Sequence, residues 1–119
     1  MMYRDEYFQR ANGECPGLSW KNSLPQNLQV KIDVKSEKLR EYGLELLNTK
    51  MLETIKGNDN DLYELKGGRC RLAVYYDRQR STFIYLNGWL KKKQRQTKDI
   101  ADARVLLHEY LNIKGEGIG

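Results

Sequence analysis

The sequence has few of the residues that carry covalent or metal chemistry. Its 119 residues include two cysteines, one histidine and two prolines. Cys15 and Cys70 form no CxxC pair and are too few for a disulfide framework, so a reducing compartment is expected. No Walker loop, GxGxxG motif or metal-ligand spacing occurs, so the sequence predicts no metal and no cofactor.

The chain also lacks a long apolar run. No stretch approaches the roughly 18 apolar residues of a membrane span. Asp5 and Glu6 stand where a signal peptide would carry its apolar segment. We therefore expect an unprocessed, soluble, cytoplasmic protein with no membrane partner.

Acidic residues are scarce in one part of the chain. Residues 1–60 balance nine lysines and arginines against nine aspartates and glutamates, whereas residues 66–98 hold ten basic residues and one acid, Asp77. Such a local excess predicts a polyanion binder, with nucleic acid as the first choice of partner and an acidic protein segment as the next. A solvated basic surface is the plainer alternative, although acids would normally be mixed into it.

The chain length suits one domain, which we place at residues 1–112, followed by a flexible tail at 113–119. Apolar spacing and turn signals predict a strand, two helices, three strands and a closing helix. The first strand lies within residues 3–10. The first helix begins at Pro16, and the second runs from Gln26 to the stop at Gly43. The three strands span 62–66, 69–76 and 82–86, and the closing helix spans 98–112. Residues 44–61 are a linker of uncertain type. The fold class is α+β, with an antiparallel sheet.

Alternation along the central strand divides the faces of this sheet. Leu72 points to one side, whereas Arg69 and Arg71 point to the other. An antiparallel sheet with helices on one side leaves its second face in water. We therefore expect an open sheet face that presents Lys66, Arg69 and Arg71.

A run of positive charge follows the last strand, in 88-GWLKKKQRQTKDI-100. Lys91, Lys92, Lys93 and Arg95 stand there with no acid among them. Cleavage of RNA through its own 2′-hydroxyl requires charge stabilisation at the phosphorus and two proton transfers. Arginine meets the charge requirement, and a lysine crowded by other cations can lose its proton and then transfer protons. The cluster therefore predicts either binding or cleavage of RNA.

Tyr75 could stack on an unpaired base. Other side chains are weaker candidates. Glu64 could act as a base, but a carboxylate between two cations is more often a salt-bridge partner. His108 is expected to be structural or at the surface, and Cys70 to be a small core residue.

Five phrases of the sequence stand in a recognisable order. They are 13-GECPGLSWKNSLP-25, 43-GLEL-46, 62-LYELK-66, 70-CRLAVYY-76 and 86-LNGWLKKKQRQTKDIADA-103. With the order of elements, they resemble the RelE/HigB superfamily of type II toxins, in particular its phage-derived HigB-like branch. The resemblance spans about residues 3–111.

The resemblance implies a RelE-like β-α-α-β-β-β-α fold and a toxin that cuts mRNA on the translating ribosome without a metal. A cognate antitoxin, often a helix-turn-helix protein, would silence it. The predicted catalytic residues are Arg71, Lys91 and Lys92. The predicted substrate-binding residues are Lys66, Arg69, Tyr75, Lys93 and Arg95.

The chain departs from the pattern of the branch at three positions. Cys70 replaces an aromatic residue, Thr97 replaces a proline, and Asn87 stands where a histidine is frequent. The last change leaves no obvious imidazole, so either a lysine carries the proton transfer or the activity is weak. Gyrase poisons of the ParE type share the fold without the nuclease chemistry, so the alternative function is a non-nuclease toxin or an inactive toxin that acts only through its antitoxin. A basic RNA-binding protein is the third interpretation.

Overall fold

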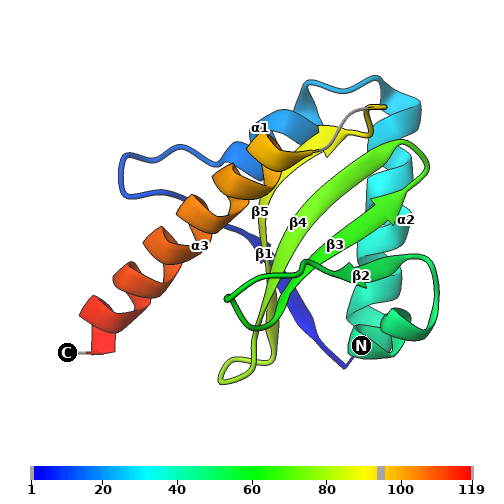
Figure 1. The fold of residues 1–119 in the computed structure, drawn as a ribbon. Coiled ribbons are helices and arrows are strands. Elements are labelled where there is room, and N and C mark those ends of the chain that lie inside the picture. The colour runs from blue at the N-terminus through cyan, green and yellow to red at the C-terminus, as the bar shows by residue number, and fades with distance from the viewer. Residues whose placement is uncertain (1, 94–95, 119) are drawn as a thin grey trace.

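The computed structural model describes residues 2–93 and 96–118, which form three α-helices, one 3₁₀ helix and five strands. The elements are β1 (Arg4–Tyr7), α1 (Pro16–Asn22), α2 (Gln26–Tyr42), η1 (Gly43–Asn48), β2 (Leu52–Thr54), β3 (Leu62–Gly67), β4 (Cys70–Asp77), β5 (Thr82–Leu90) and α3 (Thr97–Ile118) (Figure 1). The predicted order is present, and η1 and β2 occupy part of the segment whose type was uncertain. No helix in the described ranges is long and apolar enough to span a bilayer.

The strands form one sheet in the order β1-β5-β4-β3-β2. Strands β2 to β5 pair antiparallel with their neighbours, which confirms the predicted meander. Strand β1 lies parallel to β5, so the sheet is mixed at this edge. Parallel neighbours need a long connection, and the helices together with the meander provide it. Strand β5 continues to Leu90, four residues beyond its predicted end.

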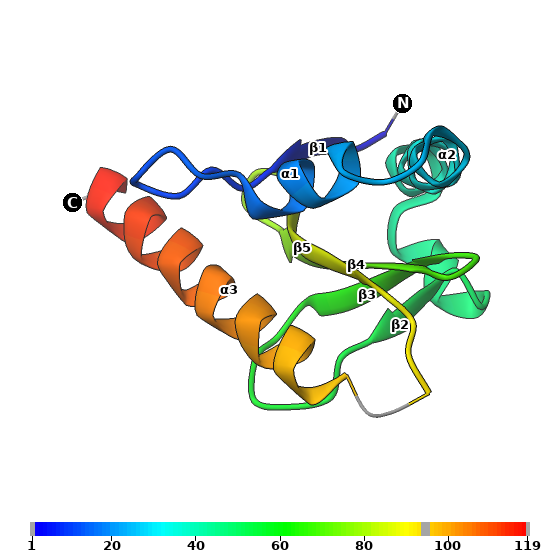
Figure 2. The same ribbon diagram turned by 90° about the horizontal axis from the view of Figure 1, so that it is seen from above.

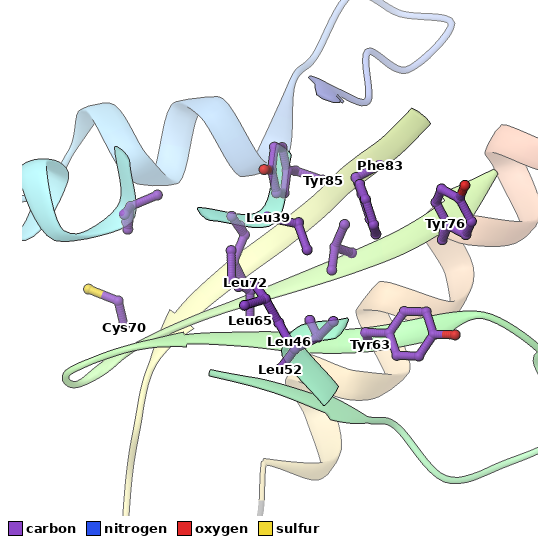
Figure 3. Packing of buried hydrophobic residues seen from close by; sticks show 12 residues of the cluster. Leu39, Leu46, Leu52, Tyr63, Leu65, Cys70, Leu72, Tyr76, Phe83 and Tyr85 are labelled. Carbon is purple, nitrogen blue, oxygen red and sulfur yellow. The ribbon is translucent and has the colours of Figure 1, made fainter. Parts of the chain in front are cut away.

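Helices cover both faces of the sheet, with α1 and α2 on one side and α3 on the other (Figure 2). One apolar cluster, which includes Leu39 and Leu72, lies on the α2 side (Figure 3). A second cluster on the α3 side includes Ala73, Ile84 and Leu107. The prediction of an open second face is therefore wrong for most of that face. The apolar side chains on this face come from several neighbouring strands, so the alternation along one strand does not reveal them.

Helix α2 follows the predicted spacing and ends where predicted. Ile32 and Leu39 are almost fully buried. Gly43 follows the helix with a φ of 59°, a conformation that favours glycine. A Cβ at Gly43 would also lie 2.3 Å from the ring of Tyr3. Glycine at position 43 therefore allows both the backbone turn that ends α2 and the close packing of Tyr3, which precedes β1.

Helix α3 packs on the sheet through a face close to the predicted one. Ala103 and Leu107 are buried as expected, but Leu111 is 38% exposed and Tyr110 is buried instead. The Tyr110 hydroxyl donates a 2.6 Å hydrogen bond to Asp77, which is itself 1% exposed. With this polar contact, the buried face of α3 includes Tyr110 in place of Leu111. Apolar spacing alone could not indicate this.

The end of α3 lies beyond the predicted boundary at residue 112. Lys114 Nζ donates a 2.9 Å hydrogen bond to Asp77 Oδ1, and the helix continues to Ile118. The ion pair holds the last turns near the end of β4. The predicted boundary was placed at a change of composition and missed this tertiary contact.

Candidate functional site

The centre of the candidate site is Arg71, on the central strand β4. Its Nη1 donates hydrogen bonds of 2.6 Å to the carbonyl oxygen of Gly68 and 2.9 Å to that of Cys70. Its Nε lies 3.7 Å from Oε1 of Glu64. Arg71 is only 8% exposed, in contrast to the open side chain expected from alternation. The guanidinium is therefore held in one orientation before any ligand arrives.

Glu64 lies on β3 beside this guanidinium, with 11% of its side chain exposed. Burial raises the pKa of the Glu64 carboxyl, although the charges of Lys66 and Arg71 oppose the shift. The salt-bridge role expected for Glu64 is present. Burial adds a second property, because a carboxyl with a raised pKa suits proton transfer near neutral pH.

A second carboxylate stands directly opposite Glu64, on the edge strand β2. Glu53 pairs with Glu64 in the register of β2 and β3, and its carboxylate accepts a hydrogen bond from Lys66 Nζ. That bond lowers the pKa of the Glu53 carboxyl, whereas burial raises the pKa of Glu64. Two neighbouring carboxyls whose pKa values move apart are a common arrangement for acid–base work. Sequence reasoning missed Glu53, because the short strand β2 was not recognised.

Lys66 and Arg71 face each other across β3 and β4 and line a groove of about 960 Å³. The charged residues described along this groove are five cations and one acid: Lys35, Lys50, Lys56, Lys66, Arg71 and Glu53. Three of these lysines come from α2 and from the segments on either side of β2. The groove therefore extends the predicted basic surface with residues that had been assigned no role.

The lysine segment begins beside Arg71, at the end of β5. Trp89 pairs with Arg71 in the register of β4 and β5. The backbone N–H of Lys91 donates a 2.8 Å hydrogen bond to the carbonyl oxygen of Arg69. Arg69 lies in the exposed turn between β3 and β4, so its predicted place within the strand is wrong. The pairing of β4 and β5 nevertheless brings the turn and the lysine segment together.

Lys91, Lys92 and Lys93 are all exposed. Arg95, another predicted binding residue, lies outside the described residues. Exposed ammonium groups next to a groove suit phosphate binding. The segment begins at Lys91, whose backbone bonds Arg69 between the groove-lining residues Gly68 and Arg71.

Tyr75 is not brought to this cluster. It lies four residues along β4 from Arg71, which is about 13 Å at the usual rise of a strand. Its half-buried ring packs against Tyr110 at a centroid distance of 5.9 Å, and burial raises the pKa of its hydroxyl. Its predicted stacking role therefore has no support from its position.

The weaker candidates from the sequence, His108 and Cys70, lie away from this cluster or in the core. His108 is exposed on α3 and bonds Asp59 at 2.9 Å, and Cys70 is buried in the core. Within residues 2–93 and 96–118, no three His, Cys, Asp or Glu side chains come together as metal ligands would. What the site offers is a fixed guanidinium, a buried carboxyl and exposed lysines. This set can bind a phosphate, stabilise negative charge on it and accept a proton.

Comparison with known families finds no family model that matches this chain, and no curated protein matches it. Solved structures do match. A chain of the archaeal RelE-RelB complex from Pyrococcus horikoshii OT3 is 15% identical with a TM-score of 0.60, and the match covers 79% of this chain and 100% of that one. A chain of the toxin-antitoxin complex RelBE2 from Mycobacterium tuberculosis is 11% identical with a TM-score of 0.53, over 76% and 100% of the two chains. A chain of the RelB-RelE complex from Methanococcus jannaschii is 18% identical with a TM-score of 0.51, and the match covers 72% of this chain and 89% of that one. The chain has the RelE fold.

Identities of 11–18% establish the fold alone. The predicted RelE-like architecture is confirmed, whereas the HigB-like branch stays a prediction. Within the RelE fold of this chain, Glu64 and Arg71 lie on strands β3 and β4, and the lysine segment joins β5 to α3. The candidate site is thus built by the meander and the connection that follows it.

Proposed function

We propose that this protein is the toxin of a type II toxin–antitoxin system and that it cleaves mRNA on the ribosome. The RelE fold supports the general assignment. The observation that carries the chemistry is the Glu64 carboxyl, buried beside the fixed guanidinium of Arg71. Arg71 in turn lines a groove that also holds four lysines. A binding surface alone would need the cations but not a carboxyl whose pKa is raised.

The proposed reaction uses the 2′-hydroxyl of the RNA as the nucleophile. Glu64 accepts the proton of this hydroxyl while the 2′-oxygen attacks the adjacent phosphorus. Arg71 stabilises the negative charge that develops on the phosphoryl oxygens. The bond from phosphorus to the 5′-oxygen breaks, and an ammonium of the Lys91–Lys93 segment gives that oxygen a proton. The products are a 2′,3′-cyclic phosphate and a 5′-hydroxyl. Because side chains fill every role, the proposed scheme assigns no catalytic step to a metal ion.

The composition of the groove supports dependence on the ribosome. Among the described residues that line it there is no aromatic side chain, and Trp89 near the site is 3% exposed. Free single-stranded RNA is usually held by stacking on exposed rings. The site supplies charge and a proton acceptor but no exposed ring for stacking, so another molecule must hold the RNA in a defined conformation. A translating ribosome provides an mRNA in a defined conformation.

The partner that silences the protein is proposed to be a cognate antitoxin. Two of the matching structures are complexes of RelE with RelB, and the third is the toxin-antitoxin complex RelBE2. A helix-turn-helix type of antitoxin is the expectation from the sequence resemblance. Co-expression of the neighbouring gene and co-purification of its product would test this partner directly.

The test of function is controlled expression followed by primer extension on cellular mRNA. Wild-type protein should stop growth and truncate messages inside their translated regions. Glu64→Gln keeps the shape of the side chain, and we expect at least about a hundredfold loss of cleavage. Glu41→Gln, on the exposed surface of α2, is the matched control and should cleave like wild type.

A second comparison tests the lysine segment. The triple change of Lys91, Lys92 and Lys93 to Ala should abolish truncation of messages while leaving the fold intact, as judged by circular dichroism. If Glu64→Gln and the triple variant are both folded and fully active, the proposed site is wrong. Growth arrest with intact transcripts and DNA damage would instead indicate a gyrase poison.

A further inference from the structure

Gln96 connects the entry of α3 to the buried carboxyl of the site. It is the residue before Thr97, at which the helix begins. Its Nε2 donates to Glu64 Oε1 at 3.5 Å, and its Oε1 accepts a 2.5 Å hydrogen bond from Trp89 Nε1. Trp89 is 3% exposed and packs in the core under α3. The side-chain amide therefore bridges a rigid buried indole and Glu64.

The indole decides which end of the amide meets the carboxylate. An indole N–H only donates, so it requires the oxygen of the amide as its partner. The NH₂ group of Gln96 is thereby turned toward Glu64. The reverse orientation would place two donors against each other at Trp89 and two acceptors against each other at Glu64. The orientation of the amide between the two residues is thus set by hydrogen-bond chemistry.

The contacts on Glu64 are unequal between its two oxygens. Oε1 receives Gln96 Nε2 at 3.5 Å and lies 3.7 Å from Arg71 Nε. No hydrogen bond joins Oε2 to any of the described residues. An arrangement that occupies one carboxylate oxygen and leaves the other for a substrate proton is suited to a base with a fixed direction.

We infer that Gln96, held by Trp89, is a positioning residue that fixes the carboxylate of Glu64 for proton transfer. The inference deepens the proposed function and rests on it for its catalytic meaning. Gln96 itself touches no reacting atom in this scheme. It acts by presenting Oε2 of Glu64 toward the substrate and by supplying a donor to the ionised form. It also ties the end of the lysine-bearing connection to the site.

The charged groups around Glu64 determine the direction of the expected effect. Lys66 and Arg71 favour its ionised form, and Glu53 on the opposite strand disfavours it. The amide of Gln96 adds a neutral donor that also favours ionisation. Removal of this donor must therefore raise the pKa of Glu64 further. A base that requires the ionised form then works only at higher pH.

The experiment compares the pH dependence of mRNA cleavage by wild type, Gln96→Ala and Trp89→Phe, on purified ribosomes programmed with one message. Trp89→Phe keeps an aromatic ring in the core but removes the donor that orients the amide. We expect the acidic limb of the Gln96→Ala profile to move to higher pH by about half a unit or more, which is about a threefold loss of rate on that limb. Trp89→Phe should move the limb in the same direction by a smaller amount. Gln26→Ala, at the exposed start of α2, is the control and should leave the profile in place.

A titration without activity separates this inference from the proposed function. The side-chain carboxyl resonance of Glu64 can be followed by carbon NMR in the same variants. A raised midpoint in Gln96→Ala and Trp89→Phe supports the positioning role, even if no cleavage is found and the nuclease proposal fails. An unchanged Glu64 midpoint in Gln96→Ala, or a fall in rate that is equal at all pH values, would overturn it.

Discussion

Replacement of Arg71 by methionine gives the sharpest test of how the site is built. The substitution keeps an unbranched side chain but removes the guanidinium. It deletes the hydrogen bonds of 2.6 and 2.9 Å to the carbonyl oxygens of Gly68 and Cys70. It also leaves the carboxylate of Glu64, 11% exposed, without the cation 3.7 Å away. A buried charge then stands without its partner.

The size of the loss follows from these contacts. Hydrogen bonds from a charged donor contribute about 1.5–3 kcal/mol each, and removal of one partner of a buried ion pair costs about 3–5 kcal/mol in total. The two figures describe overlapping contacts and are not added. We expect Arg71→Met to lower the free energy of unfolding by about 3–5 kcal/mol at pH 7.5. Arg69→Met, in the exposed turn, is the matched control and should stay within about 0.5 kcal/mol of wild type.

The cost should depend on pH through Glu64. Because burial raises the pKa of its carboxyl in the folded protein, the folded state binds this proton more readily than the unfolded state. The destabilisation by the charged form is therefore present above the folded pKa and is relieved as pH falls through it. Loss of Arg71 raises the pKa of Glu64 further. The cost of Arg71→Met should consequently be smaller at pH 4.5 than at pH 7.5.

Urea denaturation followed by circular dichroism at the two pH values measures both effects. The double variant Arg71→Met, Glu64→Leu should recover part of the loss at pH 7.5, because it removes the unpaired charge as well. A cost below about 1 kcal/mol, or an equal cost at both pH values, would refute the argument that Arg71 and Glu64 form an interdependent buried pair.

Two further predictions concern the elements that hold the site. Gly88→Ala places a Cβ 2.2 Å from the ring of Trp20, so we expect the free energy of unfolding, measured by urea denaturation, to fall by about 1–3 kcal/mol. Gly115→Ala, which has open space around it on α3, is the control and should be neutral or stabilising. An equal loss of stability in both variants would contradict the packing argument. Burial raises the pKa of the Asp77 carboxyl, but hydrogen bonds from Tyr110 and Lys114 outweigh it and the net pKa is lowered. The stabilisation by Asp77 is therefore present above its unfolded pKa of about 3.9 and lost as pH falls through the folded value. Asp77→Asn should cost about 1–3 kcal/mol at pH 7 and less at pH 3, and a cost that does not change with pH would be the contrary result.

Several features of the fold are legible in short stretches of sequence. The stop of α2 at Gly43 follows from one residue that tolerates a positive φ. The meander follows from three alternating runs separated by turn residues. Arg71 was selected because it lies on a strongly patterned strand, and the lysine segment because its charge is concentrated directly after one. Strand β2 escaped prediction because it has three residues and gains its place only by pairing with β3.

The roles within the site were less predictable. Glu64 was ranked as a salt-bridge partner because its neighbours in sequence include cations, and that part is correct. Its burial, however, goes with the pairing of β3 with β2 and with the contact to Gln96, which lies 32 positions further along the chain. Tyr75 was expected beside the cations, yet Tyr110 of α3 covers it. In both cases the deciding contact comes from a residue about 30 or more positions away.

The sequence by itself determined the order of the elements, the antiparallel meander and the concentration of positive charge after β5. These properties depend on local periodicity, turn chemistry and charge, which neighbouring residues express directly. Only the tertiary structure decided that α3 covers the second face of the sheet, and that Glu64 is buried against Arg71 and Gln96. Burial and proton affinity depend on which distant groups exclude water and supply charge, and that information exists only once the chain has folded.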